Sequence, residues 1–272
     1  METLFEFFSF RDASVIAVVL GSILVTSSSA VVGTFTFLKK KALLGDAVAH
    51  AILPGICLAF ILSGTKNPLI LVVGAFITGW LSLVVIDYIS IKTKLKEDTA
   101  IALVLSVFFG IGILMLTRIQ HSGNAAQSGL DSFLFGNAAA LIGSDLLVFA
   151  TVSASLLFLI GLLFKEMKIL AFDPEYAKVI GLPVKGLELV LTSLTVLAVV
   201  TGIQAVGVVL MAAMLITPAA AARFWTQDTF KLVVIAGFLG AFSGLAGAFV
   251  SYTAPSMPTG PWICLLYTSP SP

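Results

Sequence analysis

Eight apolar stretches, each close to the length needed to cross a bilayer, recur along this sequence and leave few folds open to it. A membrane-spanning helix needs about 20 mostly apolar residues. The sequence therefore predicts an all-α, polytopic transmembrane helix bundle, organised as one domain over residues 1–263. The stretches cover residues 13–38, 42–62, 68–90, 99–117, 144–164, 187–203, 205–222 and 231–253.

Composition supports the same class. Hydrophobic residues make up 59% of the chain and charged residues 11%, whereas a soluble domain carries about 25% charged residues. A soluble protein of this size could not hide so much apolar surface. Fifteen Lys and Arg against fourteen Asp and Glu leave no basic surface for phosphates, which excludes a nucleic-acid partner.

The cations predict the orientation of the helices in the membrane. Loops after the first, third, fifth and seventh stretches hold twelve of the fifteen Lys and Arg residues. Because cytoplasmic loops are enriched in these residues, we place those loops in the cytoplasm and the N-terminus outside. The lipid membrane is thus the first partner of this chain.

The two ends of the sequence differ from the middle. The first residues predict a short amphipathic segment on the membrane surface, whose apolar side chains include Leu4, Phe5, Phe7, Phe8 and Phe10. After the eighth stretch comes a turn-rich segment, residues 255–261, and then only six apolar residues, which cannot cross a bilayer. We therefore expect either an end outside the cell or the loss of a ninth span, with residues 264–272 as an atypical tail.

Asp46 is the only acidic residue, and His50 the only histidine, that the sequence places well inside a predicted span. They lie about 7 Å and about 13 Å beyond Lys41 along a helix axis. Their i, i+4 spacing puts both side chains on one helix face. A carboxylate oxygen and an imidazole nitrogen on one face form half of a divalent transition-metal site. The pair could instead be structural hydrogen-bonding partners or a proton relay.

The other polar and sulfur-containing residues have simpler interpretations. Pro54, followed by Gly55, removes the helical donor of the His50 carbonyl and predicts a bend. Residues 27–29 are three serines, which favour close helix packing over metal ligation. Asp87 is predicted to be a solvated charge at the inner end of the third span. Packing roles are expected for Cys57, Met211 and Met214.

Several enzyme motifs are absent from the sequence. It has no G-x-x-x-x-G-K-[ST] loop for ATP, no H-E-x-x-H zinc-protease motif and no G-x-S-x-G nucleophile elbow. These absences favour a chain that is not itself an enzyme.

A cytoplasmic loop, residues 165–186, contains the start and stop signals of a short helix. Asp173 can cap the helix, Pro174 suits its first position, and Glu175 favours its positively polarised start. Gly181 and Pro183 then end it. A helix of one or two turns is too short to stand alone, so we expect it to dock on a partner.

Three blocks together resemble the permease subunits of bacterial ABC transporters that import manganese, zinc or iron. The likeness runs from about residue 10 to residue 263, and relatives continue after residue 261 into a last hydrophobic helix. The blocks are FLKKKALLGDAVAHAILPGI (37–56), FDPEYAKVIGLPV (172–184) and AVGVVLMAAMLITPAAAA (205–222).

This resemblance implies a multi-pass protein of the bacterial plasma membrane with a central path through a homodimer. Two cytoplasmic ATP-binding subunits would drive transport, and an extracytoplasmic metal-binding protein would deliver the cation. The chain would hydrolyse no ATP and hold no permanent cofactor. The transported metal would bind Asp46 and His50. The resemblance assigns the ATPase-coupling helix to Asp173, Pro174, Glu175, Tyr176, Ala177 and the residues that follow as far as Gly181.

Two other functions remain open at this point. One is a secondary metal carrier coupled to an ion gradient, which needs no ATPase. The other is a membrane scaffold that transports nothing and uses Asp46 and His50 for structure. A carboxylate and an imidazole suit manganese, iron and zinc alike, and we favour manganese or zinc over iron.

Overall fold

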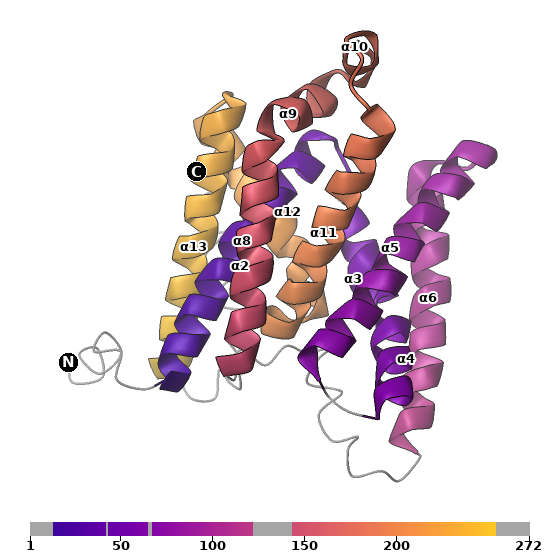
Figure 1. Cartoon of the computed structure of the whole chain (residues 1–272), viewed down its shortest axis with the longest axis vertical. Helices are drawn as coiled ribbons and strands as arrows, with labels where there is room; N and C mark the ends of the chain where they lie inside the picture. Colours follow the sequence, from indigo (N-terminus) through magenta and orange to yellow (C-terminus); the bar gives the residue numbers. More distant parts are fainter. Residues whose placement is uncertain (1–12, 42, 65–66, 122–142, 254–272) are drawn as a thin grey trace.

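The computed structural model describes residues 13–41, 43–64, 67–121 and 143–253, and these residues form helices joined by short turns (Figure 1). The amphipathic segment predicted before residue 12, most of the outer loop and the tail 264–272 lie outside the described residues. The helices are α2 (Ala13–Leu38), α3 (Leu43–Ala51), α4 (Leu53–Ser63), α5 (Pro68–Lys92), α6 (Glu97–Gln120), α8 (Gly143–Leu162), α9 (Phe164–Phe172), α10 (Pro174–Val179), α11 (Val184–Val206), α12 (Val208–Trp225) and α13 (Thr229–Thr253).

The all-α polytopic bundle is confirmed, but the predicted count of eight spans is too high. Six helical segments of the described residues are long and apolar enough to cross a membrane, with α3 and α4 counted together. A seventh exists if α8 and α9, which are bent by 71°, form one span. The apolar helix over Met211–Trp225 is shorter than a full span, because the chain breaks at Gly207 before α12 starts.

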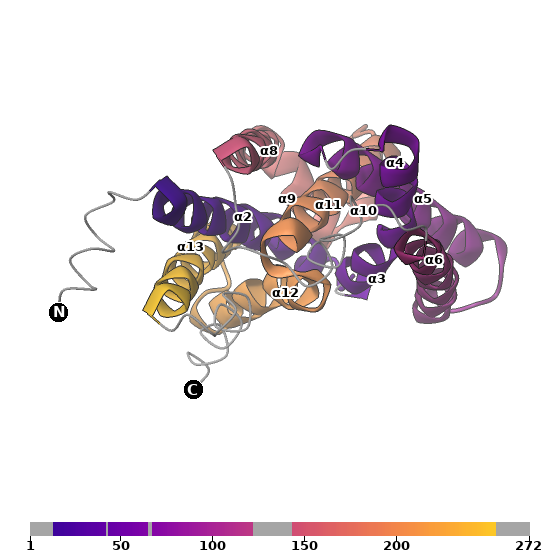
Figure 2. The same cartoon turned by 90° about the horizontal axis from the view of Figure 1, so that it is seen from below.

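The helices form two groups. One contains α2, α8 and α13, and the other contains α3, α4, α5 and α6, while α11 and α12 contact both groups. Figure 2 shows this order, with α2 and α13 on one side, α11 and α12 in the middle, and α4 to α6 on the other side. The largest apolar core lies where α3 and α4 meet α5, α6, α11 and α12.

Small residues allow α2 to pack closely against its neighbours. A side chain at Gly240 or Gly244 of α13 would overlap the backbone of α2, and one at Gly33 would overlap the backbone of α12. The Ser28 hydroxyl donates to Ser153 Oγ on α8 over 3.2 Å. The packing role predicted for the serines at residues 27–29 is thus seen at Ser28, as is usual where membrane helices approach closely.

The second predicted span is two helices joined at Ile52. The chain breaks between α3 and α4, and Pro54 occupies the first turn of α4. Because proline has no N–H, Pro54 cannot donate to the His50 carbonyl. The Ile52 N–H still donates to the Val48 carbonyl and the Ile56 N–H to the Ile52 carbonyl, so the interruption is local. The predicted bend stays a prediction. Thr78 Oγ1 of α5 donates to the Ile52 carbonyl over 3.5 Å, so a neighbouring helix supplies a donor at the break.

Two further breaks shape the bundle. Gly207, with φ 90°, separates α11 from α12. Helix α9 was not predicted from the sequence. It forms because Met167 and Leu170, three residues apart, point into the core around α2 and α11. In Figure 1, α9 and α10 lie together at the upper end of the bundle.

Candidate metal-binding site and coupling segment

Helix α3 brings Asp46 and His50 together as their spacing predicts. His50 Nε2 lies 3.5 Å from Asp46 Oδ1. Two ligands that each lie about 2.1 Å from one ion, at the tetrahedral angle, would be about 3.4 Å apart. The separation of these two atoms is therefore compatible with chelation of a single cation.

The pair lies on a face of α3 that the described part of the chain covers only in part. The Asp46 side chain is 46% exposed and that of His50 is 25% exposed. In contrast, Ala47, Val48 and Ala51 of the same helix are buried. An ionisable side chain turned towards lipid is costly, so such a face normally borders a water-filled path or another protein surface.

Packing holds the His50 ring. Phe109 of α6 meets it edge to face, with 5.1 Å between the ring centroids. His50 Nδ1 is buried and has no hydrogen-bond partner among the described residues. Metal-bound histidines usually donate their second ring nitrogen to an acceptor, and that acceptor is not found in the described part of this chain.

The described residues contain no group of three or more His, Cys, Asp or Glu side chains that could hold a metal ion. As a metal site, Asp46 and His50 would supply two ligands, which is half of a four-coordinate shell. Cys57, about two turns beyond His50, is buried and donates to the Gly112 carbonyl, as a packing residue would. We therefore do not include Cys57 in the candidate metal site.

The helix predicted in the cytoplasmic loop is confirmed as α10. Asp173 Oδ1 accepts a hydrogen bond from the Tyr176 N–H over 2.9 Å, and Pro174 occupies the first turn. Gly181, with φ 84°, ends the helix. The Lys178 ammonium group donates to Glu175 Oε1 over 2.8 Å, which raises the pKa of Lys178.

One face of the α10 segment carries exposed apolar side chains. Ala177 is buried against the bundle, whereas Tyr176, Val179 and Ile180 are 54%, 83% and 46% exposed. Exposed apolar groups at the end of a compact segment mark a surface for a protein partner. The geometry therefore supports the predicted docking role of α10, which itself stays a prediction.

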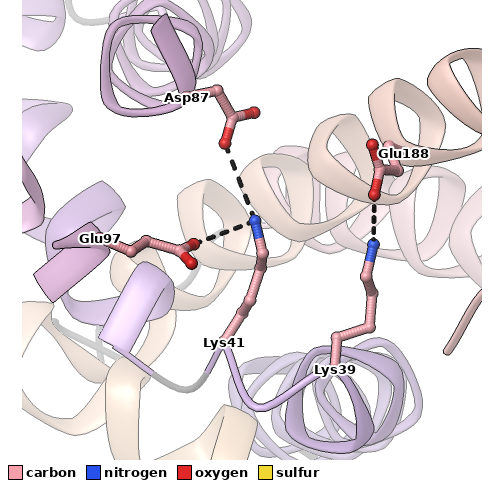
Figure 3. Close-up of polar contacts among 5 residues, drawn as sticks. All are labelled: Lys39, Lys41, Asp87, Glu97 and Glu188. Carbon is pink, nitrogen blue, oxygen red and sulfur yellow. Dashed lines mark hydrogen bonds and ion pairs between the residues drawn. The ribbon is translucent and has the colours of Figure 1, made fainter. Parts of the chain in front are cut away.

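Five charged residues that sequence analysis did not connect meet at the same end of the bundle (Figure 3). Lys39 Nζ lies 2.9 Å from Glu188 Oε1 of α11. Lys41 Nζ lies 3.0 Å from Glu97 Oε1 of α6 and 3.8 Å from Asp87 Oδ1 of α5. Asp87 is thus an ion-pair partner and not only a solvated charge. The lysine run at residues 39–41 is the sequence feature that indicates this cluster.

These charges line a cavity of about 310 Å³ between α2, α5 and α11, with Leu44 and Thr195 among its other walls. Burial alone would lower the pKa of Lys41, but the bond to Glu97 and the negative fields of Asp87, Glu97 and Glu188 outweigh it and raise that pKa above its ordinary value. Lys41 therefore stays charged at neutral pH.

Comparison with known proteins identifies the family. The model of the ABC 3 transport family matches residues 11–269. The chain belongs to this family. The resemblance to ABC-type metal permeases is confirmed, and the family agrees with the multi-pass membrane helices seen here.

Similar members of the ABC 3 transport family are named for manganese and zinc. The chain is 49% identical over 251 residues to the manganese transport system membrane protein MntC of Bacillus subtilis, covering 92% of this chain and 58% of MntC. It is 42% identical over 259 residues to the zinc transport system membrane protein TroC of Treponema pallidum, covering 95% of this chain and 87% of TroC.

The fold also matches a solved transporter of similar sequence. PsaBC from Streptococcus pneumoniae, solved in complex with Fab, superposes with a TM-score of 0.86 at 32% identity. The match covers 98% of this chain and 93% of the PsaBC chain. The helix arrangement described above is therefore shared with PsaBC.

Proposed function

We propose that this chain is the membrane-spanning permease of an ATP-driven importer of divalent manganese or zinc, with iron as a further candidate cargo. The observation that carries the proposal is the Asp46–His50 pair, 3.5 Å apart on a partly exposed face of a membrane helix. The relatives named for manganese and zinc support the same cargo.

A second copy of the chain would complete the site. The exposed face of α3 needs a cover that is not lipid, and each chain offers two ligands. A homodimer whose copies meet on this face would bring two pairs together and give up to four ligands to one cation. A mixed set of two carboxylates and two imidazoles suits manganese and zinc and accepts iron.

Two cytoplasmic ATP-binding subunits would supply the energy, because the sequence lacks an ATP-binding loop. The exposed face of α10 is the surface on which we expect each of them to dock. An extracytoplasmic metal-binding protein would deliver the cation to the outer mouth. The permease would then bind the cation through a carboxylate oxygen and a neutral imidazole nitrogen, release it to the cytoplasm, and catalyse no covalent step.

Metal uptake by cells that express the permease with its ATPase and metal-binding protein tests this function. We expect Asp46→Ala and His50→Ala each to lower Mn²⁺ or Zn²⁺ uptake by at least about tenfold, because each removes a ligand. His121→Ala is the matched control, since His121 is exposed and bonds within its own helix through the Thr117 carbonyl.

The same experiment separates the competing functions. Normal uptake in both ligand variants, at equal amounts of protein in the membrane, would overturn the proposed site. Uptake by the purified chain alone under an ion gradient would indicate a secondary carrier. A double variant with apolar residues of similar size at both positions that still works would indicate a structural role for the pair.

A further inference from the structure

The five charged residues of Figure 3 connect α11, which follows α10 in the chain, with the turn that precedes α3. We call Lys39, Lys41, Asp87, Glu97 and Glu188 the latch. Its contacts can be followed step by step from α10 to α3.

The first step joins α10 to α11. Gly181 N–H donates to the Lys178 carbonyl and Leu182 N–H to the Ala177 carbonyl, which closes the end of α10. Pro183 follows at once as the N-cap of α11. With so short a connection, a displacement of α10 moves the start of α11, where Glu188 lies in the second turn.

The second step joins α11 to the segment after α2. Lys39 Nζ contacts Glu188 Oε1 at 2.9 Å, and the Lys39 side chain is only 11% exposed. An ion pair with one nearly buried partner is less screened by water than a surface pair. Glu188 is therefore tied to a lysine that cannot follow it freely into solvent.

The third step is the backbone between Lys39 and Lys41. Lys40 has φ 59°, and it is the one residue other than glycine with positive φ in the described parts of the chain. Lys40 N–H donates to the Phe37 carbonyl and Lys41 N–H to the Thr36 carbonyl, the two bonds of a Schellman helix end. This left-handed turn fixes the two flanking lysines on a stiff segment, from which they reach different helices.

The last step joins this segment to α3 and to the second group of helices. Lys41 is held by Glu97 of α6 and Asp87 of α5, and its carbonyl accepts from the Leu44 N–H in the first turn of α3. Asp46 lies five residues after Lys41. The segment at residues 39–41 is therefore bonded to α11 on one side and to α3, α5 and α6 on the other.

We propose that the latch transmits the displacement of α10 and α11 to α3, and so couples ATP hydrolysis to release of the cation by Asp46 and His50. This inference rests on the proposed function, because it assumes an ATPase at α10 and a cation at the pair. In the arrangement described here the latch is closed, and Lys39 and Glu188 are its coupling contact.

Transport per ATP is the quantity that tests the latch. The permease is co-purified with its ATPase subunits and placed in liposomes with its metal-binding protein. The assay measures how much Mn²⁺ is moved and how much ATP is hydrolysed. We expect Lys39→Gln and Glu188→Gln to lower the ratio of Mn²⁺ to ATP by about fivefold or more. In both variants ATP hydrolysis should continue. The amount of Mn²⁺ bound at Asp46 and His50, measured by electron paramagnetic resonance, should be unchanged.

Two variants exclude a general loss of structure or charge. Lys40→Gln removes a neighbouring lysine for which the described residues provide no ion pair, and its ratio should equal that of the wild type. The double variant Lys39→Glu with Glu188→Lys exchanges the two charges but keeps an ion pair between these positions. It should restore the ratio of Mn²⁺ moved to ATP hydrolysed. Single variants with a normal ratio, or an exchange no better than the single variants, would overturn the latch.

A separate measurement keeps this inference distinct from the proposed function. Lys39→Cys combined with Glu188→Cys, with both native cysteines replaced by serine, is treated with a short bifunctional thiol reagent. We expect the cross-linked fraction to fall about fivefold when the ATPase binds a non-hydrolysable ATP analogue, and an unchanged fraction would overturn the latch. A wild-type complex that moves neither Mn²⁺ nor Zn²⁺ would overturn the proposed function only.

Discussion

Asp46 and His50 on α3 differ from the latch in how far the chain itself satisfies their charges. The α3 pair has one polar contact, 3.5 Å long and within one helix, and His50 Nδ1 has no partner among the described residues. The latch joins four elements through contacts of 2.9 to 3.8 Å. Charges satisfied inside a chain hold its parts together, whereas an incomplete pair in a membrane helix indicates a ligand from outside.

The largest effect that separates the two sites should be on metal binding. Asp46→Asn removes the anionic ligand, so we expect the affinity for Mn²⁺ or Zn²⁺ to fall by at least about tenfold. The free energy of unfolding should change by less than about 0.5 kcal/mol, because the one ion pair of Asp46 among the described residues is 3.5 Å long and within its own helix. Titration calorimetry and thermal unfolding of the purified permease measure the two quantities.

A control and a contrary result complete this comparison. Asp98→Asn, in the exposed first turn of α6, should leave the metal affinity unchanged. Asp46→Asn could instead lower the free energy of unfolding and leave the metal affinity unchanged. That result would make Asp46 a structural residue and would remove the distinction between the two sites.

The next effect concerns the stability supplied by ion pairs. A double-mutant cycle of Lys39→Ala and Glu188→Ala should give a coupling of about 1 kcal/mol, at the upper end for pairs that water still reaches. Lys178 and Glu175 form an equally short pair on exposed α10, at 2.8 Å. Thermal unfolding should show a smaller coupling there, and equal couplings would contradict the special position of Lys39.

A third effect is pH-dependent. The pKa of Lys41 in the folded state is raised above 10.5, so its contribution to stability is complete below pH 10.5 and is lost as the pH rises through the folded-state pKa. Unfolding measured between about pH 9 and pH 11.5 should show this loss, at about 1 kcal/mol or less for a partly exposed group. Lys41→Gln should flatten the profile, and a Lys41→Gln profile as steep as that of the wild type would contradict the assignment.

The sequence predicted the apolar helices and the site on α3 because both follow from local spacing. The i, i+4 arrangement of Asp46 and His50 needs only a helix, and α10 begins and ends at residues that cap helices in any context. Even the boundary between α3 and α4 at Ile52 follows from one proline, Pro54. These features require no knowledge of which helices are neighbours.

The latch could not be predicted in the same way. Lys39 and Glu188 are 149 positions apart, and only the packing of α11 against α2 makes them partners. Helix α9 was missed because its two buried residues, Met167 and Leu170, face a core that exists only after α2 and α11 have packed. The span count failed at α12, since a run of apolar letters does not reveal how much of it crosses the membrane.

The smallest effect tests the turn that holds the latch lysines apart. A residue with a side chain at φ 59° suffers a steric cost of about 1–2 kcal/mol, which glycine avoids. Glycine loses about 0.5–1 kcal/mol more through its freedom in the unfolded chain, so Lys40→Gly should stabilise the permease by about 0.5 kcal/mol in thermal unfolding. Lys40→Val, which is β-branched, should destabilise it. Because Lys39 and Lys41 keep their partners in Lys40→Gly, Mn²⁺ moved per ATP should match the wild type, and a changed ratio would mean that the stiffness of the turn itself is needed for coupling.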